Sequence, residues 1–144
     1  MRPRAASSHH RMVRNEAMKI LKLSCGPQVA RLLSRAIRVY AEQAFPAQCA
    51  TDCDQVARAA LLDAAKTLED QVASGEHRFV LNRRARVIYE AAVAVYFHGA
   101  ALVVRHGMDE QRELVLCALA GAVVSDGDLV RAIEQDGGSA EGLW

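Results

Sequence analysis

Aromatic residues and prolines are scarce in this chain. Phe, Trp and Tyr make up 5% of its 144 residues, and there are three prolines and nine glycines. Few aromatics argue against a protein that stacks the bases of a single-stranded nucleic acid on its side chains. Few prolines and glycines leave long uninterrupted segments, which favours helices over a β fold with many turns.

Familiar catalytic and cofactor motifs are also missing. The sequence has no Gly-rich phosphate loop, no nucleophile elbow, no HExxH zinc motif and no paired thiol-redox motif. Cys49 and Cys53 are four residues apart, but a closed metal site needs four ligands and no second pair has a useful spacing. We therefore expect a protein that is not an enzyme and that holds no metal and no cofactor, with its cysteines acting as small hydrophobic residues.

The segment Val87–Val104 is the longest apolar stretch. Its length is near the lower limit of a membrane span, which is roughly 17–25 residues. It carries Glu90 and His98, and arginines flank both ends. A charged residue in a span is costly, so we predict a helix buried at the centre of a bundle, with His98 bonded to a backbone carbonyl in the core or at an interface. The chain has no secretory signal, so we expect no membrane association and a cytoplasmic location.

Hydrophobic periodicity predicts helices along most of the chain, and 51% hydrophobic residues suffice for one sizeable core. The expected fold class is all-α, a single-domain bundle of five or six helices with one long, largely buried central helix. The predicted helices span residues 27–45, 52–73, about 76–105 (one long or two collinear), 109–124 and 126–135. We expect residues 1–11 to be a flexible basic arm, 12–136 to be the helical domain and 137–144 to be a loose tail.

Turn and capping residues set the predicted helix ends. Gly26 and Pro27 suit the start of one helix. Thr51 with Asp54, and Ser125 with Asp128, have the three-residue spacing of capping boxes. These two pairs predict the beginnings of the helices that follow them.

Residues 12–24 are compatible with two structures. Their apolar residues line one face of a helix, yet Lys19–Ser24 is also compatible with a short strand. As a strand followed by two helices, residues 19–73 faintly resemble a ribbon-helix-helix unit, a class of DNA-binding protein. The predicted helices are too long for that unit and the strand alternation is imperfect, so we do not assign the chain to this family.

Charge is distributed unevenly along the chain. Residues 1–45 hold nine basic and two acidic residues, a net charge of +7, whereas residues 46–144 have a net charge of −6. A basic helical face with a basic arm is suited to phosphate contacts, although the same charges would also neutralise the acidic part within one fold or a dimer. The residues expected to contact nucleic acid are Arg11, Arg14, Lys19, Lys22, Arg31, Arg35 and Arg38. Further along, Arg83, Arg84 and Arg86 would extend this surface or pair with Glu90 and acidic helices.

Two functions fit these patterns. The first is a small nucleic-acid-binding regulator or accessory protein, expected to be a homo-oligomer and most simply a dimer. The second is a protein-binding helical module, such as an adaptor, an inhibitor or a subunit of a larger assembly. The second rests on apolar segments such as Leu114–Val124, and it places Leu114 and Leu116 at a partner interface.

Overall fold

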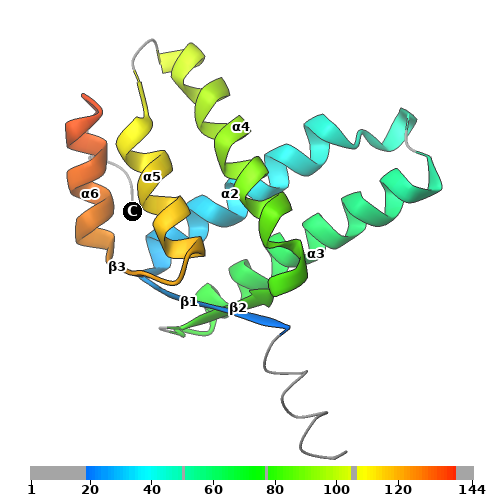
Figure 1. Ribbon diagram of the computed structural model, residues 1–144, viewed down its shortest axis with the longest axis horizontal. Helices are drawn as coiled ribbons and strands as arrows, with labels where there is room; N and C mark the ends of the chain where they lie inside the picture. Colours follow the sequence, from blue (N-terminus) through cyan, green and yellow to red (C-terminus); the bar gives the residue numbers. More distant parts are fainter. Residues whose placement is uncertain (1–18, 50, 77, 105–106, 139–144) are drawn as a thin grey trace, which may run out of the picture.

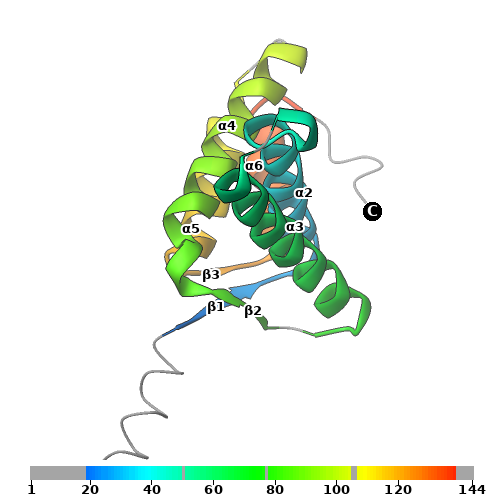
Figure 2. The ribbon, with the colours of Figure 1, turned by 90° about the vertical axis from the view of Figure 1, so that its right-hand side faces the viewer.

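The computed structural model describes residues 19–49, 51–76, 78–104 and 107–138, and this part of the chain is mostly helical. Within these ranges the chain forms five α-helices and a small three-stranded sheet. Helices and sheet form two layers, with the sheet beneath the helices (Figures 1 and 2). In chain order the elements are β1 (Ile20–Cys25), α2 (Pro27–Ala44), a 3₁₀ turn (Ala47–Cys49), α3 (Asp52–Ala73), β2 (Phe79–Asn82), a 3₁₀ turn (Arg83–Ala85), α4 (Arg86–Val104), α5 (Asp109–Leu119), β3 (Val123–Val124) and α6 (Asp126–Gln135). The expected all-α class is confirmed in its coarse form, and the small sheet is an addition that the prediction did not include.

The sheet has the strand order β2-β1-β3, with β1 in the centre. β1 pairs antiparallel with β2 and parallel with β3. Side chains alternate between the two faces of a strand, and here one face is buried under the helices. The buried face is formed by Leu21, Leu23, Cys25, Phe79, Leu81 and Val124.

Helices α2 and α3 form a hairpin above the sheet (Figure 1). The predicted bounds of both helices are confirmed within a residue. Pro27 occupies the first turn of α2, and the side chains and backbones of Thr51 and Asp54 form the predicted capping box at the start of α3. Ser125 and Asp128 form the second predicted capping box at the start of α6.

The long helix expected over residues 76–105 is wrong in its first third. Phe79–Asn82 is a strand in which Phe79 and Leu81 are buried while Val80 and Asn82 are exposed. Gly75, with a positive φ of 75°, follows the end of α3. The burial of residues 79–82 then alternates with a period of two, which matches a half-buried strand better than a helix.

Helix α4 is therefore shorter than expected, and it is not buried all round. Tyr89, Val93 and Phe97 face the core, but Val87 is 77% exposed and Val95 is 44% exposed. Because the residues of α4 are mostly apolar on every side, the sequence did not show which face of the helix is exposed. No helix among the described residues is long and apolar enough to cross a membrane.

The helix expected over residues 109–124 also ends early. It stops at Leu119, and Gly121 has a φ of 97°, a left-handed conformation that favours glycine. Val123 and Val124 then pair with Ser24 and Cys25 as β3.

For residues 19–24 the strand alternative is the one that the structure shows. The pairing of β1 also limits the likeness to a ribbon-helix-helix unit. β2 pairs with Ile20–Leu23 on one edge of β1, and β3 pairs with Ser24 and Cys25 on the other edge. A ribbon with a second copy could therefore not extend along the whole strand.

Candidate phosphate-binding surfaces

A shallow groove of about 370 Å³ lies between α2 and the C-terminal end of α3. Arg31, Arg35 and Arg38 line it from α2, and all three are exposed. They share one face because residues three and four apart are neighbours on a helix. Val72 and Ala73 of α3 complete the wall. The groove thus brings together three of the arginines that the sequence predicted to contact phosphate.

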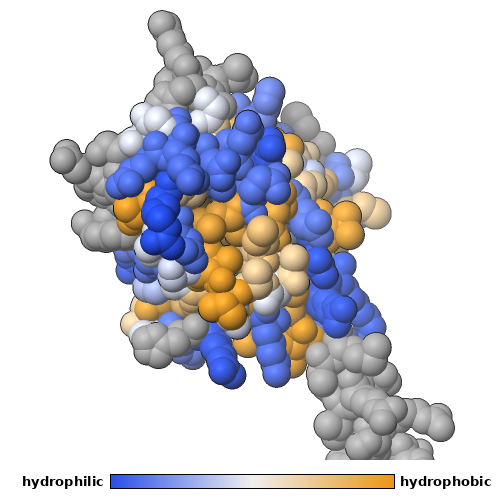
Figure 3. All heavy atoms as spheres, turned by 60° about the vertical axis from the view of Figure 1, so that its left-hand side comes forward, coloured by the Kyte–Doolittle hydropathy of each residue, from blue (hydrophilic) through white to orange (hydrophobic). Residues whose placement is uncertain are grey.

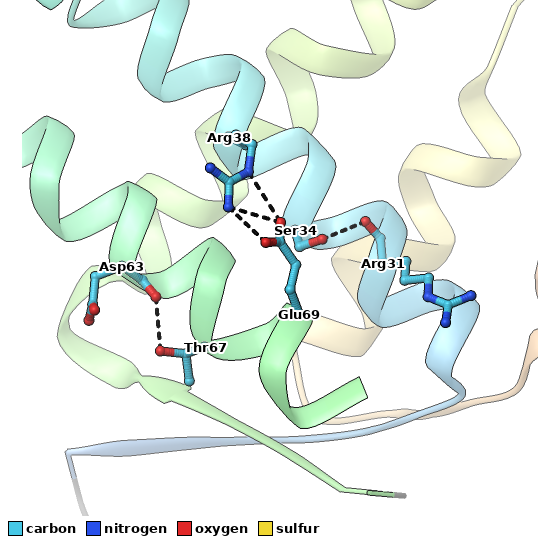
Figure 4. A network of polar contacts seen from close by, with 6 residues as sticks. All are labelled: Arg31, Ser34, Arg38, Asp63, Thr67 and Glu69. Carbon is cyan, nitrogen blue, oxygen red and sulfur yellow. Dashed lines mark hydrogen bonds and ion pairs between the residues drawn. The ribbon is translucent and has the colours of Figure 1, made fainter. Parts of the chain in front are cut away.

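Arg38 differs from the other two arginines because it is paired with a carboxylate. Its Nη2 donates to Oε1 of Glu69 at 2.8 Å, and its Nε donates to Oε2 at 3.1 Å. Figure 4 shows this two-pronged contact across α2 and α3, with the Arg31 side chain directed away from Glu69. Both partners are more than two-fifths exposed, so solvent screens the pair. Glu69 nevertheless cancels one of the three positive charges of the groove.

Arg31 and Arg35 form no ion pair with any described residue. The nearby Ser34 hydroxyl is engaged with the backbone, since it donates to the Arg31 carbonyl at 2.8 Å. Two arginines that line the groove are therefore without a carboxylate partner in the part of the chain that the structure describes. A guanidinium is always charged, and its planar fork matches the oxygens of a phosphate.

The structure separates the predicted lysines from this groove. Lys22 projects from the outer face of the sheet, and Lys19 is exposed next to the start of β1. Arg11 and Arg14 lie outside the described residues. The predicted set is thus spread over at least two surfaces rather than one.

Unpaired cations concentrate at these two surfaces. Among the described residues, the arginines in ion pairs are Arg38, Arg58, Arg86, Arg112 and Arg131. Lysines and arginines with no ion pair to another described residue are Lys19, Lys22, Arg31, Arg35, Lys66, Arg78, Arg83 and Arg84. All of these except Lys66 belong to the α2 groove or to the strands and their ends. No described carboxylate therefore forms an ion pair with them.

Arg78 is the residue of these surfaces that sequence reasoning missed. It directly precedes β2, and it lines a hollow of about 400 Å³ with Ser24 and Val123 on the sheet. Recognising the period of two in Phe79–Asn82 would have placed it beside the strands. The sequence also suggested Arg83, Arg84 and Arg86 as an extension of the basic surface. Arg86 pairs with Glu90 at 3.3 Å, whereas Arg83 and Arg84 are exposed just after β2.

The predicted partner residues Leu114 and Leu116 lie on α5, and both are partly buried against the core. Figure 3 brings forward the side on which α5 and α6 lie, and apolar side chains gather at its centre among hydrophilic ones. Leu114 also lines a groove of about 320 Å³ between α5 and α6, whose other residues include Glu113 and Arg131. The two leucines thus contribute to the core rather than standing free of it.

The remaining candidate groups do not converge. No cluster of three His, Cys, Asp or Glu side chains able to hold a metal occurs among the described residues. His98 is exposed on α4 and so does not lie in the core, whereas its expected place at an interface stays a prediction. Burial raises the pKa of the Cys25 thiol to about 12, with the charge of Asp126 as a smaller cause, so this thiol stays protonated and unreactive at neutral pH.

The comparisons with protein-family models, with curated proteins and with solved structures each found no match for this chain.

Proposed function

We propose that this protein is a non-enzymatic regulator or accessory protein that binds nucleic acid through phosphate contacts made by the α2 groove. The observation that carries the proposal is the pair Arg31 and Arg35, which face this groove without an acidic partner among the described residues. A structural role for these side chains would be expected to show as ion pairs, as it does for the neighbouring Arg38 and Glu69.

The spacing of the three arginines suits an extended polyanion. Residues 31 to 38 span about 10 Å along a helix that rises about 1.5 Å per residue. Successive phosphates of one DNA strand are about 3.4 Å apart along the duplex axis. The groove thus fits a short run of phosphates, and its residues offer no aromatic surface for stacking. These features support binding to the backbone without reading the bases.

The test is binding of the full chain to a random DNA duplex across a salt series. Wild-type affinity is expected to fall steeply with salt, because each neutralised phosphate releases counterions. Arg31→Glu with Arg35→Glu is expected to lower the affinity and to flatten the salt slope by about 2, which is about 1 per lost phosphate contact. Lys66→Glu is the control, since Lys66 is exposed and unpaired among the described residues but lies outside the groove. If the double variant binds as the control does, the proposal fails.

A protein-binding module is the second candidate function, and the exposed apolar face of α4 favours it. Val87, Ile88 and Val95 are exposed there, and the neighbouring Ala94 and His98 carry no fixed charge. The partner we propose is a second copy of this chain, because two neutral apolar faces bury no unpaired charge when they meet. This proposal also covers the expected homo-oligomer.

Solution mass measured over a range of protein concentrations tests this second candidate. The wild type is expected to form a dimer that persists at high salt, and Val95→Glu is expected to shift it to the monomer. Val56→Glu is the control, because Val56 is 71% exposed on α3, away from α4. A wild type that stays monomeric at all concentrations contradicts the proposal.

A further inference from the structure

The strands and their ends carry a second group of unpaired cations. Its members are Lys19, Lys22, Arg78, Arg83 and Arg84. None of them forms an ion pair with another described residue. Carboxylates also lie near the strands. Asp126 lines the same hollow as Arg78, and its Oδ1 accepts from the backbone N–H groups of Gln28 and Val29. Asp63 of α3 lines a pocket with Val80 and Asn82.

The outer face of the sheet has a mixed surface. Lys22 lies opposite Val80 in the antiparallel register, and Ile20 lies opposite Asn82. Val123 adds the most exposed large apolar side chain on this face, at 84%. Apolar side chains therefore occupy the face, with basic ones among and beside them, and the strands contain no acidic residue.

We infer that this outer face is a second phosphate-binding surface that acts together with the α2 groove, an inference that rests on the proposed function. Charge complementarity points to the partner: Lys22 within the strands and Lys19, Arg78 and Arg83 directly next to their ends are all cations. Asp126 shares the hollow with Arg78, but its carboxylate accepts from the backbone of α2. An ordinary protein partner would present both positive and negative side chains to this surface. A nucleic acid meets it with one sign, and its sugars can contact Ile20 and Val80.

Continuity with the preceding segment supports the same partner. Residues 1–18 join the sheet at Lys19, and they contain four arginines, including Arg11 and Arg14, against one acid. A polyanion on the outer face meets the end of the sheet to which this basic segment is attached. Lys19 and Lys22 are thereby assigned to the sheet surface, whereas the three arginines of α2 form the other surface.

The experiment compares two double variants of the full chain in the duplex salt series. One reverses the sheet cations, Lys22→Glu with Arg78→Glu, and the other is Arg31→Glu with Arg35→Glu. Lys66→Glu measures the effect of a reversed charge elsewhere. Thermal unfolding verifies folding, and Lys22→Gln with Arg78→Gln replaces the reversal if the first variant is unfolded. Vesicles of an anionic lipid are a parallel probe.

The inference predicts that each double variant flattens the salt slope by about 2, and that the four changes together flatten it by about 4. If only the α2 variant differs from the control, the inference is overturned while the proposed function stands. If the wild type does not bind the duplex, both are overturned. A sheet variant that weakens binding to vesicles but not to the duplex overturns the inference in favour of a membrane surface.

Discussion

The carboxylate of Asp126 caps the helix that contains Val29, although the two residues lie far apart in the chain. Asp126 Oδ1 accepts hydrogen bonds from the backbone N–H of Val29 at 3.2 Å and of Gln28 at 3.0 Å. Gly26 at the N-cap has no side chain to do this. Because β1 and β3 are parallel neighbours, the helices that follow them, α2 and α6, begin side by side. Asp126 is the first residue of α6, and its side chain caps α2. This contact ties the N-terminal end of α2, the helix that carries the groove arginines, to α6.

Asp126→Ala is therefore expected to destabilise the protein. Loss of an N-cap side chain costs about 1–2 kcal/mol, and the helix end also loses a favourable negative charge. Chemical denaturation of the two proteins measures the difference. Asp70→Ala is the control because Asp70 is exposed within α3. An Asp126→Ala variant as stable as the control would contradict the capping role.

Two glycine-to-alanine changes are expected to alter the free energy of unfolding in opposite directions. A Cβ at Gly26 would lie 2.3 Å from the Asp126 carboxylate oxygen and 2.9 Å from its backbone nitrogen, so the contact between α2 and α6 must open. At Gly99, inside α4, a Cβ meets nothing within 4 Å. Gly99→Ala should raise the free energy of unfolding by up to about 1 kcal/mol through helix propensity, whereas Gly26→Ala should lower it. The melting temperatures of both variants, compared with the wild type, measure these changes. Two melting temperatures that shift in the same direction would refute the prediction.

The Gln71 side chain completes the outer edge of β2. Its Nε2 donates to the Val80 carbonyl at 3.2 Å, and its Oε1 accepts from the Val80 N–H at 3.0 Å. An amide placed in this way occupies the groups with which another strand would pair. Gln71→Ala is expected to cost about 1 kcal/mol of stability and to increase self-association. Light scattering during mild heating measures the latter, with Gln55→Ala on α3 as the control, and equal aggregation of the two variants would exclude an edge-protecting role.

Buried Cys25 predicts a loss of stability at alkaline pH. Its pKa is raised to about 12 from the usual 9.0, so the unfolded chain loses the thiol proton at a lower pH than the folded one. The contribution is fully present below about pH 9 and is lost as the pH rises from 9 to 12, by at most about 1.4 kcal/mol per pH unit. Denaturation between pH 8 and about pH 10 is expected to show a shallower fall for Cys25→Ala than for Cys53→Ala, whose thiol is exposed. Identical pH slopes would show that Cys25 does not titrate as described.

Helices bounded by strong local chemistry could be predicted from the sequence. The bounds of α2, α3 and α6 follow from Pro27 and from two capping boxes, and these depend on residues close together in the chain. The strands could not be predicted with equal certainty, because β1 is held by pairing with segments about 60 and 100 residues away. Local propensity carries little information about such pairing.

The candidate site was predictable in part for the same reason. Arg31, Arg35 and Arg38 were placed on one face because helical spacing fixes their relation. Their pairing state could not be read from the sequence, since Glu69 reaches Arg38 only through the packing of α3 on α2. Arg78 was missed because its place depends on a strand that periodicity had assigned to a helix.

Glu69→Gln gives the most direct test of phosphate binding in the α2 groove. Removing this carboxylate charge releases Arg38 and gives the groove a third available arginine. The duplex salt series is expected to show tighter binding and a slope steeper by about 1. Glu42→Gln is the control, because it makes the same charge change and removes the carboxylate partner of Arg58 outside the groove, where Arg58 keeps its bond to the Phe45 carbonyl. Binding that strengthens for Glu69→Gln beyond the control supports the account, and binding that is equal for the two variants, or unchanged from the wild type, contradicts it.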